Sequence, residues 1–169
     1  MSGQTMHQVL SKYWGYSTFR PVQEDIISSV LAGKDTLALL PTGGGKSICF
    51  QVPGLMLEGL TLVVTPLIAL MKDQVENLRK RGIAAEAIFS GMSARETDLA
   101  FNHVLHGSAR FLYLSPERLV TEKFLSMLPS MNVSLIAVDE AHCISQWGYD
   151  FRPPYLRIAE IRAYLPGIP

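Results

Sequence analysis

The sequence has few cysteines, no excess of either charge and no long apolar run. Its 169 residues include only two cysteines, Cys49 and Cys143, which indicate neither a disulfide framework nor a metal site. His103 and His106 lie three residues apart without a Cys or carboxylate at ligand spacing, so we assign them no metal. No stretch approaches the roughly 18 apolar residues of a membrane span, and no signal-peptide pattern opens the chain. We expect an intracellular protein without membrane contact, in the cytoplasm or nucleoid of a bacterium or the nucleus of a eukaryote.

The charges balance, with fifteen basic and fifteen acidic residues. No field over the whole chain attracts nucleic acid, so any such contact must be local. The sequence contains no repeat, low-complexity tract or linker, and 48% of its residues are hydrophobic. These features predict a single α/β domain over residues 1–169.

Apolar runs alternate with amphipathic segments along most of the chain, a pattern typical of crossover units around a parallel sheet. We expect strands at Thr36–Leu40, Leu60–Thr65, Ala85–Phe89, Phe111–Leu114 and Leu135–Asp139. We expect helices at His7–Tyr13, Val22–Ala32, Lys46–Val52, Ile68–Arg81, Ala94–Leu105, Thr121–Leu128 and Tyr155–Tyr164. The final turn, Leu165–Pro169, is of the kind that leads into a further element, so we expect the parent chain to continue.

A glycine-rich loop follows the first apolar run, and it reads Leu40-Pro41-Thr42-Gly43-Gly44-Gly45-Lys46-Ser47. Consecutive glycines let backbone N–H groups turn inward around phosphate oxygens, while Lys46 supplies a charge and Ser47 a hydroxyl for Mg²⁺. Leu40 stands where the strict phosphate-loop pattern has its first glycine. The loop predicts a nucleoside triphosphate as ligand, with one departure from the strict pattern.

A second motif, Asp139-Glu140-Ala141-His142, follows the apolar run Ser134–Val138. Ligands of open α/β sheets bind outside the carboxyl ends of the strands, so we expect this motif and the glycine-rich loop to meet there. Asp139 would hold Mg²⁺, and Glu140 would orient or deprotonate the water that attacks the γ-phosphate. The plainer alternative is that the acidic pair caps a helix after a strand.

Several segments, in order, resemble the first motor domain of RecQ-type DNA helicases, which belong to helicase superfamily 2. They are Gly15-Tyr16 with Phe19–Gln23, Pro41–Ser47, Thr65–Val75, Tyr113–Leu119, Asp139–His142 and Cys143–Tyr155. The last resembles the aromatic-rich loop that distinguishes RecQ proteins, although Tyr149 replaces the usual His and Pro154 fills a variable position. The resemblance implies a P-loop NTPase domain of RecA type, an α/β fold with a mostly parallel sheet flanked by helices, which ends before the strand that carries the next helicase motif.

The resemblance also assigns nucleotide contacts. Gln23 would recognise the adenine edge, Tyr16 would stack on the base, and Arg20 would hold this segment near the nucleotide. Gln23 as a solvated helix-face amide and Tyr16 as a core residue beside Trp14 remain alternatives. The phosphate contacts would be Thr42, Gly43, Gly44, Gly45, Lys46 and Ser47, with Mg²⁺ on Ser47 and Asp139. The catalytic residues would be Lys46, Asp139, Glu140 and His142.

Two further segments, Thr65–Val75 and Ser115–Leu119, resemble contacts for single-stranded DNA. Lys72 and Arg118 are the candidates for charge contacts with its phosphates. The alternative is that both are solvated charges beside an apolar helix stripe.

The aromatic-rich loop offers rings and a cation together. Trp147, Phe151 and Arg152 could stack single-stranded bases and hold their backbone, although Phe151 could equally pack in a core. His142 would couple this loop to the nucleotide site.

The resemblance therefore implies the ATP-binding lobe of an ATP-dependent 3′-to-5′ DNA helicase of recombination and repair. Its partners would be ATP, Mg²⁺, single-stranded or duplex DNA and a second RecA-like domain that supplies transition-state arginines. The lobe without that domain should bind ATP·Mg²⁺ weakly, hydrolyse it slowly or not at all, and unwind nothing. An ATP-binding switch that is never a motor, and a superfamily 2 RNA helicase, are the alternatives.

Overall fold

The computed structural model describes residues 3–41, 45–141 and 153–169. These form two compact units, the first made of residues 1–58 with residue 169 and the second of residues 59–168. No helix in these described ranges has the length and hydropathy that a membrane span requires. The single domain over residues 1–169 stays a prediction.

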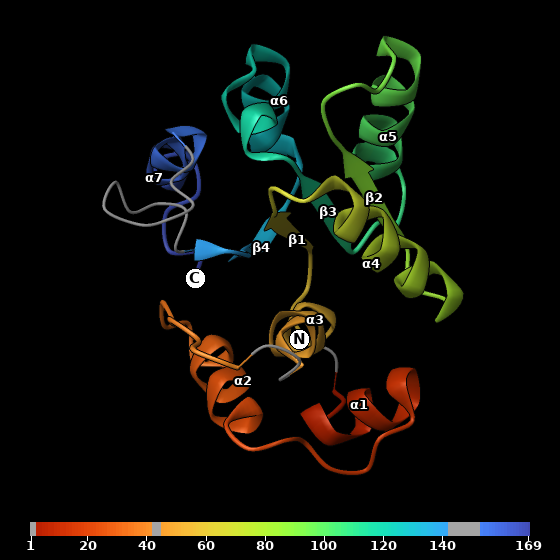
Figure 1. Cartoon of the computed structure of the whole chain (residues 1–169), viewed down its shortest axis with the longest axis vertical. Helices are drawn as coiled ribbons and strands as arrows, with labels where there is room; N and C mark the ends of the chain where they lie inside the picture. Colours follow the sequence, from red (N-terminus) through yellow and green to blue (C-terminus); the bar gives the residue numbers. More distant parts are fainter. Residues whose placement is uncertain (1–2, 42–44, 142–152) are drawn as a thin grey trace. The chain divides into compact units, whose positions relative to one another are not determined.

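The first unit is helical (Figure 1) and contains α1 (Met6–Trp14), α2 (Gln23–Leu31) and α3 (Lys46–Met56). A capping box between Thr5 and Gln8 starts α1, and Gly15 ends it in a left-handed conformation with φ of 74°. Helix α3 packs against both α1 and α2. Ile27 and Val52 are fully buried in this packing. The helices are therefore joined by an apolar core of their own.

The expected strand Thr36–Leu40 is wrong, because residues 34–41 have no regular secondary structure. Leu37 and Leu39 are 76% and 81% exposed, so this apolar run is not buried. A strand is stabilised by hydrogen bonds and side-chain contacts with a neighbouring strand, not by the β propensity of its residues. Thr36–Leu40 pairs with no strand among the described residues, so the β propensity of its residues alone does not make it a strand.

The second unit is built on a parallel sheet in the order β2-β3-β1-β4. Its strands are β1 (Leu60–Val64), β2 (Ala85–Ile88), β3 (Phe111–Leu114) and β4 (Val133–Val138). All five residues of β1 are buried, as expected for a central strand between two parallel neighbours. The other four predicted strands are thus confirmed, with β4 beginning two residues before its predicted start.

Helices of the second unit cover both faces of this sheet (Figure 1). They are α4 (Ile68–Lys80), α5 (Ala94–His106), α6 (Glu122–Met127) and α7 (Ile158–Arg162), with 3₁₀ helices η1 (Pro116–Val120), η2 (Leu128–Ser130) and η4 (Pro153–Arg157). Alternate strand residues such as Leu62 and Leu112 join the main core with Phe101 of α5 and Phe124 of α6. On the opposite face the hydroxyl of Tyr113 donates to Gln74 of α4 at 2.7 Å.

Six of the seven predicted helices are confirmed with changes at their ends, and the last one is wrong in part. Helix α3 runs past the predicted Val52 and includes Pro53. The predicted helix Tyr155–Tyr164 is instead a 3₁₀ turn followed by the short α7. After Arg162 the backbone N–H groups of Ala163, Tyr164 and Leu165 donate to the carbonyl three residues back instead of four, so the α-helix ends there in tighter turns.

We predict that Gly59→Ala destabilises the protein by about 2–4 kcal/mol. Gly59 has φ of 108°, and an added Cβ would collide with the carbonyl oxygen of Asn132, which accepts a hydrogen bond from Leu60 N at 2.9 Å. Gly82→Ala is the matched control, because Gly82 has φ of 80° with no atom within 4 Å of the added Cβ. Urea unfolding should show a loss of only about 1 kcal/mol for the control, and equal losses would contradict the predicted collision.

Candidate functional site

The glycine-rich loop leads into the N-terminus of α3. Residues 42–44 lie outside the described residues, but Gly45 caps the helix in a left-handed conformation with φ of 76°. Lys46 is exposed and Ser47 half-buried in the first turn of this eleven-residue helix. Backbone N–H groups of a first helical turn have no partner within the helix and attract anions. The described part of the loop therefore has the local geometry of a phosphate site.

Gln23 links this loop to the preceding segment. The side chain is 2% exposed, its Oε1 accepts from Arg20 N at 2.8 Å, and its Nε2 donates to Gly45 O at 3.1 Å. The alternative of a solvated helix-face amide is thus wrong. Recognition of adenine by Gln23 stays a prediction, and the observed bonds show that its amide orientation is set by the backbone on both sides.

Tyr16 and Arg20 are both on the surface of the first unit. Tyr16 is 56% exposed, so the alternative of ordinary core packing beside Trp14 does not describe it. Arg20 is exposed, and its Cδ would lie 3.9 Å from a Cβ added to Gly45. The two predicted nucleotide contacts therefore stay predictions, on side chains that solvent can reach.

Cys49 lies one turn into α3 and is 5% exposed. Burial raises the pKa of its thiol to about 11, and a hydrogen bond from the backbone of Cys49 itself lowers this pKa in part. Its Sγ donates to Gly45 O at 3.8 Å. A thiol with this pKa stays protonated near neutral pH, so Cys49 is a packing residue and no nucleophile. Cys143 lies outside the described residues.

The acidic motif stands at the carboxyl end of β4. Asp139 N donates to Val64 O of β1 at 2.8 Å, so the strand pairing continues one residue past β4. Glu140 N donates to Asp139 Oδ1 at 3.0 Å, and Glu140 has φ of 56°. The left-handed region costs a residue other than glycine about 1 kcal/mol, and such conformations concentrate at functional sites. Both side chains are half-buried, whereas His142 lies outside the described residues.

Two hydroxyls lie at the same edge of the sheet. Thr65 follows β1 and Ser115 follows β3, and the side-chain oxygen of each is buried without a hydrogen-bond partner among the residues that the structure describes. Thr61 Oγ1 shares this feature but lies within β1 and away from the edge. An unsatisfied buried hydroxyl costs about 1–3 kcal/mol, which a bound ligand oxygen would recover. Thr65 and Ser115 are consequently candidates for ligand contacts.

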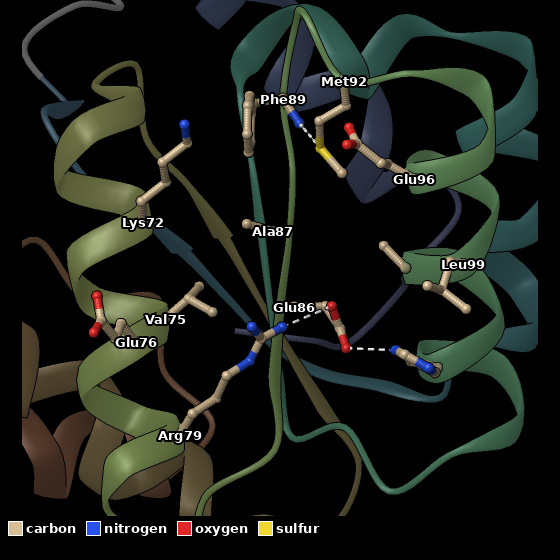
Figure 2. A pocket seen from close by; sticks show the side chains of 12 residues that line it. Lys72, Val75, Glu76, Arg79, Glu86, Ala87, Phe89, Met92, Glu96 and Leu99 are labelled. Atoms are coloured by element: carbon tan, nitrogen blue, oxygen red, sulfur yellow. Dashed lines mark hydrogen bonds and ion pairs between the residues drawn. The ribbon is translucent and has the colours of Figure 1, made fainter.

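Both predicted charge contacts meet at Phe89, directly after β2. Lys72 Nζ lies 4.9 Å from the centroid of the Phe89 ring (Figure 2), and Arg118 Nη2 donates to Phe89 O at 3.0 Å. Lys72 is exposed and Arg118 is half-buried. The structure thus brings the two cations to one residue, and their contacts with DNA phosphates stay predictions. The sequence did not indicate that Phe89 is a meeting point of these cations, because an aromatic residue at the end of a predicted strand is normally expected to pack in the core.

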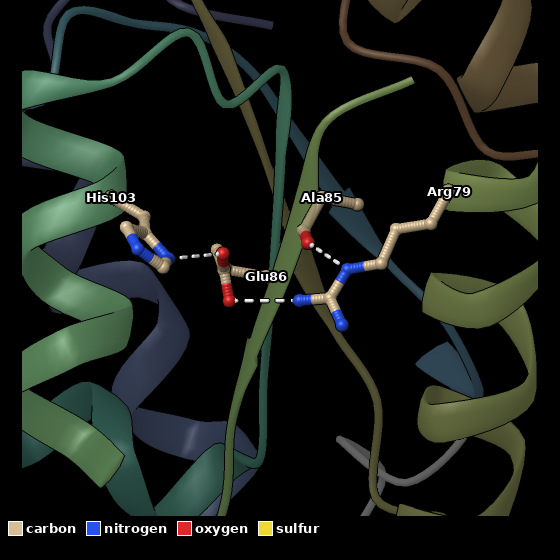
Figure 3. Close-up of polar contacts among 4 residues, drawn as sticks. All are labelled: Arg79, Ala85, Glu86 and His103. Atoms are coloured by element: carbon tan, nitrogen blue, oxygen red, sulfur yellow. Dashed lines mark hydrogen bonds and ion pairs between the residues drawn. The ribbon is translucent and has the colours of Figure 1, made fainter. Parts of the chain in front are cut away.

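A cavity of about 600 Å³ lies along the edge strand β2, between α4 and α5 (Figure 2). Glu86 is among the residues that line this cavity and contacts both helices (Figure 3), with Oε2 at 3.0 Å from Arg79 Nη2 and Oε1 at 2.7 Å from His103 Nδ1. His103 therefore has a carboxylate partner that its sequence spacing did not show. In the described part of the chain, no group of three or more His, Cys, Asp or Glu side chains is arranged to hold a metal.

The parallel sheet with helices on both faces defines an α/β domain of RecA-like fold. Residues 20–166 match the model of the DEAD/DEAH box helicase family, and the chain belongs to that family. Within it, the chain resembles the RecQ helicase of Pasteurella multocida at 45% identity, over 98% of this chain and 26% of that protein. The probable DNA helicase RecS of Bacillus subtilis is 47% identical over 95% of this chain and 32% of its own length. The RecQ resemblance is confirmed, and the chain spans about a quarter to a third of these relatives.

Solved structures agree on the fold. A hypothetical ATP-dependent RNA helicase from Sulfolobus tokodaii has a TM-score of 0.66 at 23% identity, covering 95% of this chain and 45% of that one. The helicase MrfA, solved bound to DNA, has a TM-score of 0.68 at 21% identity, covering 81% and 21% respectively. The expected fold class, a mostly parallel sheet flanked by helices in a RecA-like domain, is thus confirmed.

We predict that Gln23→Ala lowers both stability and nucleotide affinity. Loss of two buried hydrogen bonds should cost about 2 kcal/mol of unfolding free energy, and ATP affinity should fall about tenfold because Gly45 loses its anchor. Gln8→Ala is the matched control, since Gln8 also accepts from a backbone N–H, that of Thr5 at 2.9 Å, but on an exposed cap. Thermal unfolding and ATP titration would check this. Unchanged ATP affinity in Gln23→Ala would contradict its role at the loop.

Proposed function

We propose that this chain is the ATP-binding lobe of an ATP-dependent 3′-to-5′ DNA helicase of RecQ type, which acts in recombination and repair inside the cell. The observation that carries the proposal is the order of groups at one edge of the sheet. Thr65 N donates to Leu114 O at 3.1 Å, next to Ser115, and Asp139 N donates to Val64 O at 2.8 Å, next to Thr65. Backbone hydrogen bonds therefore connect the candidate DNA contacts to the acidic motif.

The nucleotide would be held by the glycine-rich loop, with Lys46 on its phosphates and Gln23, Tyr16 and Arg20 near the base. Ser47 and Asp139 would be the Mg²⁺ ligands, because a hydroxyl and a carboxylate are hard oxygen ligands and Mg²⁺ usually takes only one or two carboxylates beside phosphates and water. Bound there, Mg²⁺ would neutralise developing phosphate charge. Glu140 would orient the attacking water and receive its proton, with His142 coupling this step to DNA.

Single-stranded DNA would lie along the β1 and β3 ends of the same edge. Buried hydroxyls of Thr65 and Ser115 can donate to phosphate oxygens, and Lys72 and Arg118 supply local positive charge in a chain with no net charge. Trp147, Phe151 and Arg152 would complete this contact. Backbone contacts of this kind are independent of base sequence, as a motor that moves along DNA requires.

Residues 1–169 would form most of the first motor domain, and the parent protein would supply a second RecA-like domain with the transition-state arginines. A lobe without them should hydrolyse ATP slowly or not at all and unwind nothing. Two alternatives remain. One, from another functional class, is an ATP-binding switch that is never a motor, and the other is a related motor, a superfamily 2 RNA helicase. DNA stimulation of ATP hydrolysis distinguishes all three.

Lys46→Ala should reduce ATP affinity at least about tenfold, because a hydrogen bond to a charged group contributes about 1.5–3 kcal/mol. Lys46 is exposed, so the unfolding temperature should not change. Lys34→Ala is the matched control, an exposed lysine of the same unit outside the loop. Titration with a fluorescent ATP analogue measures both variants. If Lys46→Ala kept its affinity for ATP, the assignment of the glycine-rich loop as the phosphate site would be wrong.

In the parent protein with its second motor domain, single-stranded DNA should strongly stimulate ATP hydrolysis. Trp147→Ala should reduce that stimulation about tenfold, since stacking of a base on an aromatic ring contributes about 1–3 kcal/mol. Tyr164→Ala, which removes an exposed aromatic ring outside the aromatic-rich loop, should leave the stimulation unchanged. Hydrolysis indifferent to DNA would favour the switch, and stronger stimulation by single-stranded RNA would favour the RNA helicase.

A further inference from the structure

The side chain of Tyr155 reaches from η4 to the acidic motif. It is 1% exposed, its ring belongs to the main core, and its hydroxyl donates to the backbone oxygen of Asp139 at 2.9 Å. The two residues are sixteen positions apart along the chain. Tyr155 is the last residue of the aromatic-rich segment, but the sequence assigned it no role of its own, and its burial would suggest only a packing role.

The peptide between Asp139 and Glu140 is held at both of its polar ends. Its carbonyl oxygen accepts from Tyr155, and its N–H, that of Glu140, donates to Asp139 Oδ1 at 3.0 Å. Because a peptide unit is planar, fixing the direction of the oxygen also fixes the direction of the N–H. The N–H in turn holds one oxygen of the Asp139 carboxylate. The Tyr155 hydroxyl therefore acts on a side chain that it does not touch.

The same peptide plane sets the backbone of Glu140. Its φ of 56° is unfavourable for a residue with a Cβ, and such a conformation persists only where surrounding contacts over-determine it. On the N-terminal side, Asp139 N is bound to Val64 O at 2.8 Å. On the C-terminal side, the carbonyl oxygen of the Asp139–Glu140 peptide accepts a hydrogen bond from the Tyr155 hydroxyl at 2.9 Å. Loss of the hydroxyl would let the plane rotate and turn both carboxylates.

We infer that Tyr155 is a positioning residue, whose hydroxyl orients the Asp139–Glu140 peptide and thereby aims the metal-binding and water-orienting carboxylates. The inference rests on the proposed function, because it takes Asp139 as the Mg²⁺ ligand and Glu140 as the residue that orients water. Tyr155 makes no contact with nucleotide or metal in this role. Its effect should be on metal affinity and turnover, with little effect on the affinity for ATP.

Tyr155→Phe in the full-length parent protein tests this, because phenylalanine keeps the buried ring and removes only the hydroxyl. Tyr113→Phe is the matched control, since Tyr113 is equally buried and its hydroxyl donates to the Gln74 side chain on α4. Three quantities are compared: Mn²⁺ binding to the ADP complex by electron paramagnetic resonance, the amide exchange rate of Glu140, and kcat and KM for ATP.

In Tyr155→Phe we expect Mn²⁺ affinity and kcat to fall at least about fivefold, with KM for ATP within about twofold and faster exchange of the Glu140 amide. Tyr113→Phe should match the unaltered protein in all three. Ile161→Val, a packing change in the same core cluster, should also match it, which separates the hydroxyl from general loosening.

Equal Mn²⁺ affinity and equal Glu140 exchange in Tyr155→Phe and Tyr113→Phe would overturn the inference and leave Tyr155 as a packing residue. An unaltered parent that binds Mn²⁺·ADP but hydrolyses no ATP would overturn the proposed function instead, while the Mn²⁺ and exchange comparisons would still decide the role of Tyr155. An unaltered parent that binds no Mn²⁺ would overturn both.

Discussion

The pairing of β1 with β3 on one side and β4 on the other is the constraint on which the second unit depends. Every residue of β1 is buried, so its backbone groups have no access to water and must pair with neighbouring strands. These bonds hold the carboxyl ends of three strands in fixed register. Ser115, Thr65 and Asp139 are consequently placed side by side, although they are far apart in the sequence.

The charge of the side chains changes from positive to negative along this edge of the sheet, although the chain has no net charge. Cations gather near Phe89 at the β2 end, through Lys72 and Arg118, and carboxylates stand at the β4 end. Neutral hydroxyls lie between them on β1 and β3. A chain with fifteen charges of each sign can therefore place positive side chains at one end of this edge and carboxylates at the other, as the proposed phosphate and Mg²⁺ sites require. Local arrangement, and not total charge, makes both sites possible.

The edge strand β2 is protected from pairing with another chain by a side chain of α4. Arg79 Nε donates to Ala85 O of β2 at 3.0 Å while its Nη2 pairs with Glu86, and Glu86 also contacts His103. A side chain that occupies an outward carbonyl removes a point at which another chain could pair. The same residues join α4 and α5 across β2. This cluster is structural, and it explains the charged lining of the cavity beside it.

The sequence by itself determined the elements whose signals are local. Four of the predicted strands, six of the predicted helices and the family motifs depend on periodicity, caps and short patterns, which neighbouring residues encode. Tertiary structure decided the features that depend on contact with a residue far away in the sequence, such as strand pairing, burial and long-range hydrogen bonds. Thr36–Leu40 has β propensity but pairs with no strand among the described residues, and Gln23 is buried because Gly45 lies against it. Tyr155 gains its place beside Asp139 only through packing, because a hydrogen bond between residues so far apart leaves no periodic trace in a sequence.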